Sequence, residues 1–164
     1  MATQTKLVDF KSQDLPLLQR WLTRHHVEPW FANTQEFLDW AARRPINAGQ
    51  HIILHDSKPV GYLRWQLVDR QALDSVGLFD VPHNSADVDI LIGEPAATGS
   101  AVGPAALLLL ASKLKSIGGV PMIGLTSSVD NKLAHKAFEK AGFKLTTQYS
   151  VPEFGECYLF TLAL

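Results

Sequence analysis

The stretch from residue 87 to residue 103, which reads DVDILIGEPAATGSAVG, has the residue types of an anion-binding site. The β-branched and leucine run Val88–Ile92 predicts a short buried strand. The loop 95–103 that follows is rich in Gly, Ala, Ser and Thr, and Pro104 predicts the start of a helix. Small residues let a ligand approach the backbone, and the first amides of a helix lack partners, so this arrangement favours the binding of a phosphate.

The loop does not match the two best-known phosphate-binding motifs. A P-loop requires Gly-Lys-Ser/Thr at the start of the helix, and the dinucleotide fingerprint requires the spacing Gly-x-Gly-x-x-Gly. Here the residues before the helix are Gly99-Ser100-Ala101-Val102-Gly103, which fit neither pattern. The loop therefore predicts a phosphate ligand without identifying it.

Two carboxylates, Asp87 and Asp89, lie at the start of the predicted strand. Residues two apart in a strand point to the same face, so the two side chains are expected to be neighbours. Repulsion between paired carboxylates raises one pKa toward a value at which the group can take a proton from an ammonium. The pair is therefore suited to attracting a cation and removing its proton.

Hydrophobic patterning predicts the elements that position these residues. Helices are expected to begin near residues 12–14, Thr34, Pro104 and Asp130. The segment 69–85 has no periodic pattern of hydrophobic residues, so it is expected to be a loop near the substrate opening. A strand, a helix and a second strand around Pro104 force a parallel pair with a right-handed crossover. The fold class is therefore predicted as a mixed α/β domain with a central sheet. Its strands are expected over 6–10, 51–55, 60–68, 88–92, 122–128, 144–151 and 156–164.

The composition is that of an ordinary globular chain, with one domain over residues 1–164. Hydrophobic residues make up 46%, charged residues 19%, and the net charge is −1, so nothing attracts the chain to nucleic acid or to an anionic membrane. A cytoplasmic location is predicted from two observations. The sequence has one cysteine, Cys157, and it has neither an apolar leader nor a hydrophobic stretch long enough to span a membrane. The six histidines show no ligand spacing, so no metal site is predicted.

A second motif follows the predicted strand 122–128, where residues 130–143 read DNKLAHKAFEKAGF. Together with the earlier strand, loop and helix, this segment resembles the GNAT superfamily of acetyl-CoA-dependent N-acetyltransferases, through the pattern Asn-x-x-Ala-x-x-x-aromatic-Glu-Lys-x-Gly-Phe. Within the superfamily the chain is most similar to the aminoglycoside 6′-N-acetyltransferases. The residues that carry this similarity are WL at 21–22, VEPW at 27–30, PVGY at 59–62 and VD at 88–89.

The resemblance implies a GNAT-like fold, with a splayed parallel strand pair in a mixed central sheet and flanking helices, and acetyl-CoA as co-substrate. It implies that amides of the buried strand hold the pantetheine arm and the thioester oxygen, and that the loop holds the pyrophosphate. Residues of the second motif then flank the arm. The cofactor-binding residues implied in this way are Ile90, Leu91, Ile92, Thr98, Gly99, Ser100, Ala101, Val102, Gly103, Pro104, Asn131, Ala134 and Phe138.

Three residues depart from the family pattern. Thr98 replaces a Gln or Arg and Ala101 replaces a Gly, which predicts weaker binding of the pyrophosphate, and Ala101 is tolerable only if its φ angle is negative. Phe138 stands where many members carry a tyrosine that protonates the leaving thiolate. Three outcomes stay open: the thiolate leaves unassisted, Tyr149 or Tyr158 donates instead, or catalysis is impaired.

The same resemblance assigns roles on the acceptor side. Asp89 is implied as the catalytic base. The predicted substrate-binding residues are an aromatic side chain, Trp30, and the carboxylates of Asp80, Asp87 and Glu153. Carboxylates of this kind attract a polycationic sugar or polyamine.

The acceptor stays open among several classes. The favoured acceptor is a small cationic amine, aminoglycoside-like, with no nucleic-acid or membrane partner, and a homodimer is left open. The aminoglycoside group carries an aspartate where this chain has Thr126, which counts against aminoglycosides in particular but not against amine acetylation. The alternatives are a peptide N-terminus or another small amine as acceptor, and a catalytically silent CoA-binding module.

Overall fold

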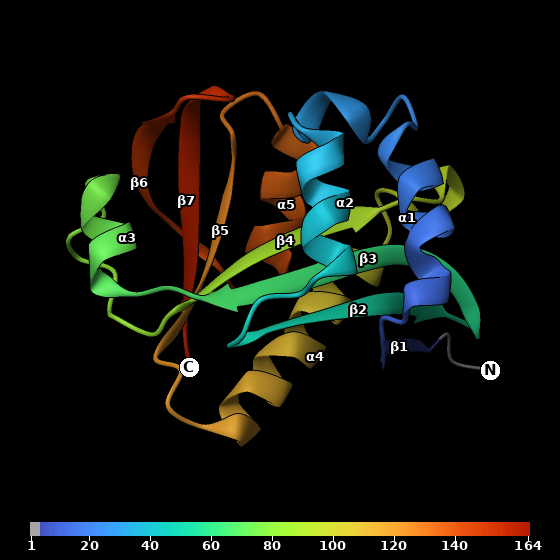
Figure 1. Ribbon diagram of the computed structural model, residues 1–164, viewed down its shortest axis with the longest axis horizontal. Helices are drawn as coiled ribbons and strands as arrows, with labels where there is room; N and C mark the ends of the chain where they lie inside the picture. The colour runs from blue at the N-terminus through green and yellow to red at the C-terminus, as the bar shows by residue number, and fades with distance from the viewer. Residues whose placement is uncertain (1–3) are drawn as a thin grey trace.

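Seven strands form one mixed sheet in the order β1-β2-β3-β4-β5-β7-β6 (Figure 1). The computed structural model describes residues 4–164. Within this range β4 and β5 are parallel and connected through a helix, as the sequence predicted, whereas the other neighbours are antiparallel. The strands are β1 (Thr5–Asp9), β2 (Ala48–His55), β3 (Lys58–Leu67), β4 (Ala86–Ile92), β5 (Met122–Ser128), β6 (Lys144–Val151) and β7 (Gly155–Ala163).

Helices cover both faces of the sheet. On one face, α4 and α5 share a core cluster with Val88 of β4 and Leu125 of β5. On the other face, α1 and α2 share a cluster with Tyr62 of β3 and Leu91 of β4. The helices are α1 (Leu15–Leu22), α2 (Thr34–Ala42), α3 (Arg70–Ser75), α4 (Val102–Ile117) and α5 (Lys132–Lys140), with short 3-10 turns at Ser12–Asp14, Glu28–Trp30 and Pro95–Ala97.

The two helices that follow β4 and β5 begin at slightly different residues than predicted. α4 begins at Val102, so Pro104 is its third residue, which is tolerated because the first amides of a helix have no intrahelical acceptor. Ala101 precedes it with a φ of −77°, so the condition that φ be negative is met and alanine is unstrained there. α5 begins after Asn131, whose side-chain oxygen accepts from the Ala134 amide at 3.4 Å and caps the helix.

The prediction that 69–85 is a loop near the substrate opening is wrong. The segment contains α3, which begins after Asp69, whose carboxylate accepts a hydrogen bond from the Ala72 amide at 2.8 Å. A helix of six residues covers fewer than two turns, so it leaves no hydrophobic period in the sequence. Its Leu73 packs with Leu159 of β7, which places this segment against the β7 end of the sheet.

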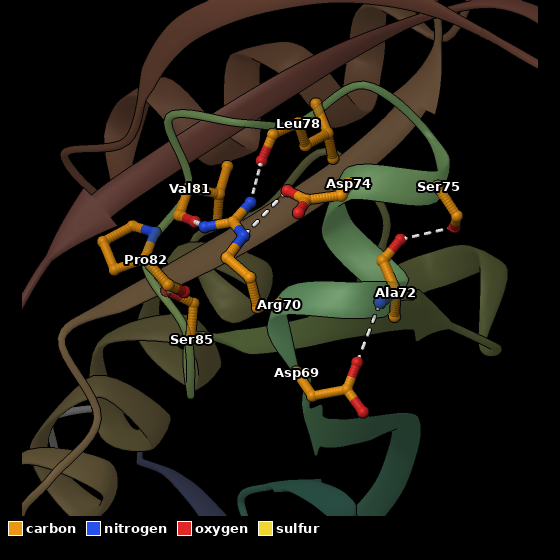
Figure 2. Close-up of polar contacts among 9 residues, drawn as sticks. All are labelled: Asp69, Arg70, Ala72, Asp74, Ser75, Leu78, Val81, Pro82 and Ser85. Carbon is orange, nitrogen blue, oxygen red and sulfur yellow. Dashed lines mark hydrogen bonds and ion pairs between the residues drawn. The ribbon is translucent and has the colours of Figure 1, made fainter.

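The rest of this segment is held by the side chain of Arg70 (Figure 2). Its guanidinium donates to the carbonyl oxygens of Val81 at 2.6 Å and Leu78 at 2.8 Å. It also donates to the carboxylate of Asp74 at 2.8 Å, one turn along α3. The contacts with Val81 and Leu78 tie the returning chain to the helix, and sequence patterning cannot reveal them because they depend on the folded path. The Arg70–Asp74 pair, by contrast, has the i,i+4 spacing of a local helical pair.

β4 and β5 separate along their length. In the described part of the chain they form three residue pairs, of which the last is Val88–Leu125. Beyond that pair, β4 remains paired with β3 as far as Ile92, and β5 remains paired with β7 as far as Ser128. Figure 1 shows the two strands diverging from their common start, which confirms the predicted splay.

The far end of β4 rests on the helical layer that contains α1. Trp21 of α1 is fully buried and donates from Nε1 to the Glu94 carboxylate at 2.9 Å. The His26 ring nitrogen Nε2 lies 2.8 Å from the carbonyl oxygen of Ile92 and, because a carbonyl only accepts, donates to it. A Cβ on Gly93 would lie 2.0 Å from the indole of Trp21. The chain can therefore leave β4 along this path only with a glycine at position 93.

Gly93→Ala should lower the free energy of unfolding by about 2 kcal/mol, because the new methyl group overlaps a buried indole that has no room to move. Chemical denaturation measures this change. Gly103→Ala is the matched control, since its Cβ would meet only the Ala137 methyl at 3.8 Å. Equal stability of Gly93→Ala and the wild type would contradict the packing described here.

Candidate active site

A cavity of about 1420 Å³ lies where β4 and β5 separate. Its walls come from the two strands, from α2 and α5, and from the loop before α4. The predicted site residues that line it are Trp30, Asp87, Asp89, Ile90, Leu91, Ile92, Thr98, Gly99, Ser100, Gly103, Pro104, Asn131, Ala134, Phe138 and Glu153.

Three predicted site residues lie outside the lining. Val102 is 2% exposed, and its side chain belongs to the core while its amide donates to the Ser100 hydroxyl at 3.3 Å. Ala101 is exposed beside the start of α4. Asp80 belongs to the segment after α3, which packs toward β7 and contributes no residue to the cleft.

One end of the cleft suits a phosphate. Gly99 has a φ of +71°, a conformation that L side chains rarely adopt, and it shapes the loop that leads into α4. The N-cap of α4 is Ala101, whose methyl group cannot accept a hydrogen bond, so the positive end of the helix dipole stays open to a ligand. Gly103 adds no side chain to this surface.

The α5 wall of the same end is cationic. Lys132, Lys136 and Lys140 recur every four residues and all line the cleft. Patterning alone favours an exposed, solvated face for such lysines, and their position relative to the cleft comes from the packing of α5. Phe138 is 5% exposed and lies edge-on to Phe160 at 5.4 Å, so it combines a core contact with a place in the wall. Helix amides and lysines together fit a coenzyme that carries several phosphates.

The middle of the cleft is bordered by backbone that has lost its strand partner. Ile90, Leu91 and Ile92 lie beyond the last β4–β5 pair, and alternate backbone groups of such a strand point toward the missing neighbour. Peptide N–H and C=O groups in this position can bind the amides of an extended arm and donate to a carbonyl oxygen. The Ile92 carbonyl is the exception, since it already accepts from His26.

The two predicted carboxylates differ in their surroundings. Asp89 accepts a hydrogen bond on Oδ2 from Arg64 Nε at 2.9 Å and forms an ion pair with it. Asp87 keeps an exposed surface toward the cleft, yet protein atoms closely surround its carboxylate. Burial first, and then the negative charge of Asp89, raises the pKa of Asp87 to about 7, while Arg64 opposes the shift. Asp87 can therefore exchange a proton near neutral pH.

Arg64 is a site residue that sequence patterning did not indicate. Its guanidinium carbon lies 3.7 Å from the ring centroid of Phe37 and 4.8 Å from that of Trp40, both on α2. The arginine thus joins the α2 wall to Asp89 through stacking and an ion pair. The only signal in the sequence is an arginine within a strand of mostly apolar residues, Lys58–Leu67.

Tyr149 completes the wall on the Asp87 side. Its hydroxyl lies 2.6 Å from the hydroxyl of Thr126, and burial raises its pKa. Tyr158, the other tyrosine considered as a donor, is not among the lining residues and lies edge-on to His135 at 5.3 Å.

In residues 4–164, the His, Cys, Asp and Glu side chains form no group of three that could hold a metal ion. Over the same range, no helix is both long enough and apolar enough to cross a membrane.

The comparisons with known proteins agree with this geometry. Residues 11–151 match the family model of the acetyltransferase (GNAT) domain. No curated protein is significantly similar to the chain in sequence. Among solved structures, the aminoglycoside acetyltransferase AAC(6′)-Ib in complex with coenzyme A superposes with a TM-score of 0.81 at 21% identity, covering 98% of this chain and 95% of that one.

Two further similar structures show how widely the fold is shared. An aminoglycoside N(6′)-acetyltransferase from Legionella pneumophila has a TM-score of 0.77 at 14% identity, covering 99% of this chain and 94% of that one. RimL, a ribosomal L7/L12 α-N-protein acetyltransferase in complex with coenzyme A, has a TM-score of 0.75 at 10% identity, covering 99% and 96%. At these identities the likeness establishes the fold.

The family model spans most of the chain, and the cleft has an open helix terminus, a cationic wall and unpaired strand backbone. The chain belongs to the GNAT family of acetyltransferases, and it is an N-acetyltransferase whose co-substrate is acetyl-CoA.

Proposed function

We propose that the enzyme transfers the acetyl group of acetyl-CoA to an amine of a small polycationic acceptor of the aminoglycoside or polyamine kind. The observation that carries this proposal is the separation of charge along the cleft. Three lysines of α5 line the coenzyme side together with one carboxylate, Asp130, whereas the other five lining carboxylates come from α2, β4 and the turn between β6 and β7. These carboxylates are Glu36, Asp39, Asp87, Asp89 and Glu153.

Aromatic side chains support the same acceptor class. Trp30, Phe37 and Trp40 line the carboxylate end, and aromatic faces suit both sugar rings and ammonium groups. The similar enzyme AAC(6′)-Ib is known in complexes with ribostamycin and with kanamycin. Thr126 lies in this wall where the aminoglycoside group has an aspartate, so the acceptor need not be an aminoglycoside itself.

Direct attack by the acceptor amine requires removal of a proton from its ammonium form. We assign this step to Asp87 rather than to Asp89, which the resemblance implied. Asp89 already accepts a hydrogen bond from Arg64, whereas Asp87 faces the cleft with a pKa raised to about 7. Asp89 then acts through its charge, which helps to raise the pKa of Asp87, and through Arg64, which it holds against α2.

Asp87→Asn should lower kcat about 100-fold to 10,000-fold, the range expected when a general base is removed. In the wild type, kcat/KM should rise with pH through about 7 as Asp87 loses its proton, and this rise should be absent in Asp87→Asn. A pH–rate profile measures both effects. The variant should be more stable than the wild type at pH 8, because the raised pKa shows that the ionised Asp87 is disfavoured in the fold.

Asp89→Asn is the matched variant for this assignment. Removing the negative charge of Asp89 lowers the pKa of Asp87, so the rise in kcat/KM should shift to lower pH while most of the activity remains. If Asp87→Asn kept the inflection near pH 7 and Asp89→Asn lost it, the base would be Asp89.

Glu153→Gln should raise KM for a polycationic acceptor about threefold to tenfold with little change in kcat, because it removes one carboxylate that attracts the acceptor. Asp80→Asn removes a similar charge outside the cleft and should leave both constants unchanged. Thiol release from acetyl-CoA measures these effects, with aminoglycosides, linear polyamines and peptide N-termini as acceptors. Preference for peptide N-termini, or equal effects of both substitutions, would contradict a polycationic acceptor.

A further inference from the structure

The departing coenzyme sulfur lacks the donor that the family pattern would supply, because residue 138 is phenylalanine. Neither of the two tyrosines considered as substitutes lines the cleft from the coenzyme side of the sheet. Tyr158 does not line the cleft. Tyr149 lines the cleft from the Asp87 side, where its hydroxyl is hydrogen-bonded to that of Thr126. Another hydroxyl must be sought among the residues that face α4 and α5.

Ser127 is such a residue. Leu125, two positions earlier in β5, packs in the core cluster of α4 and α5, so Ser127 points to the same face. Its hydroxyl oxygen lies 2.9 Å from Nε2 of His135 on α5, and Ser127 lines the cleft. Extending the register from the last pair, Val88–Leu125, places Ser127 opposite Ile90, across the gap between the separated strands.

The proton positions in this pair follow from a third atom. Nε2 of His135 also lies 3.0 Å from the carbonyl oxygen of Ser128, which can only accept a hydrogen bond. Nε2 therefore carries a hydrogen and donates it to both oxygens. The Ser127 oxygen is an acceptor toward His135, so its own O–H is free to donate to a ligand in the cleft.

The imidazole of His135 is held rigidly in this orientation. Its ring stacks on Phe160 at 5.2 Å and meets Tyr158 edge-on at 5.3 Å. Burial lowers its pKa, which keeps the ring neutral near pH 7. Because Nε2 already bears a hydrogen, His135 cannot accept the proton of Ser127, and the pair is unsuited to making Ser127 a nucleophile.

We propose that Ser127 is a catalytic residue that donates a hydrogen bond to the sulfur of the departing coenzyme A, and that His135 is the positioning residue that orients it. This inference rests on the proposed acetyl transfer. The acceptor nitrogen bonds to the acetyl carbon, the carbon–sulfur bond breaks, and its electron pair stays on sulfur as a thiolate. The ammonium form of the acceptor loses two protons in all. Asp87 takes the first before attack and passes it to water, and then takes the second, which the nitrogen sheds after attack. Ser127 keeps its hydrogen, and water protonates the thiolate after release.

Ser127→Ala should lower kcat about 10-fold to 100-fold, the effect of losing a hydrogen bond to a developing charge, with KM for acetyl-CoA unchanged. Ser127→Thr keeps the hydroxyl and should retain most of the activity. His135→Gln keeps an N–H donor and should be more active than His135→Leu. Ser150→Ala removes an exposed hydroxyl outside the cleft and should behave as the wild type.

An acetyl donor with a better leaving group distinguishes the loss of a catalytic hydrogen bond from structural damage caused by the substitution. The acetyl selenoester of the selenol analogue of coenzyme A releases a more acidic group, which needs less stabilisation. The deficit of Ser127→Ala relative to the wild type should therefore shrink with this donor. An equal deficit with thioester and selenoester, or a larger loss of activity in Tyr149→Phe than in Ser127→Ala, would overturn the assignment.

Titration of bound coenzyme A tests the same hydrogen bond without any acceptor. The ultraviolet absorbance of the thiolate, corrected for the protein alone, gives the acid dissociation constant of the bound thiol. This constant should be about 10-fold to 100-fold smaller in Ser127→Ala than in the wild type, and identical constants would refute the proposal. If the wild type acetylated no polycationic amine, the proposed acceptor would fail while this titration still decided the role of Ser127.

Discussion

The cleft exists because of one constraint: β4 and β5 begin as a hydrogen-bonded parallel pair and cannot stay paired along their length. Each is held along its full length by an outer neighbour, β4 by β3 and β5 by β7, and these neighbours lead the two strands apart beyond Val88. Backbone N–H and C=O groups in the middle of a sheet then lack partners. An extended ligand with amides of its own can replace the missing strand contacts. The buried Trp21 beneath Gly93 and the His26 bond to Ile92 support the free end of β4 in this open arrangement.

The alternation of side chains along these two strands gives the two sides of the cleft different linings. In β4, Val88 faces the α4 and α5 side, whereas Asp87, Asp89 and Leu91 point to the α1 and α2 side. In β5, Ser127 contacts His135 of α5, and its neighbour Thr126 contacts Tyr149 on the opposite face. The lysines of α5 therefore border the cleft from one side of the sheet, and Asp87 and Asp89 border it from the other. A shift of either strand by one residue would exchange these environments.

Much of the site could be predicted from local sequence. The strand and small-residue loop of 88–103 and the motif of 130–143 mark the coenzyme side, because backbone conformation and helix capping are decided by nearby residues. The acceptor side was harder to predict. Arg64 has no local signal, since its role comes from Asp89 on a neighbouring strand and from the aromatic rings of α2. Asp80 was expected in the cleft, but α3 and the Arg70 contacts hold its segment elsewhere.

The sequence by itself determined the order of the seven strands and of α1, α2, α4 and α5 along the chain, and it determined the parallel pair, because these follow from periodicity and chain order. The small residues before α4 and the spacing of Asp87 and Asp89 were likewise evident in the sequence. Only the tertiary structure decided which carboxylate is hydrogen-bonded to an arginine, which carboxylate has a raised pKa, and which hydroxyl of β5 contacts His135 and lines the cleft. Those properties depend on charges and donors that arrive from distant parts of the chain, at distances that local patterns do not encode.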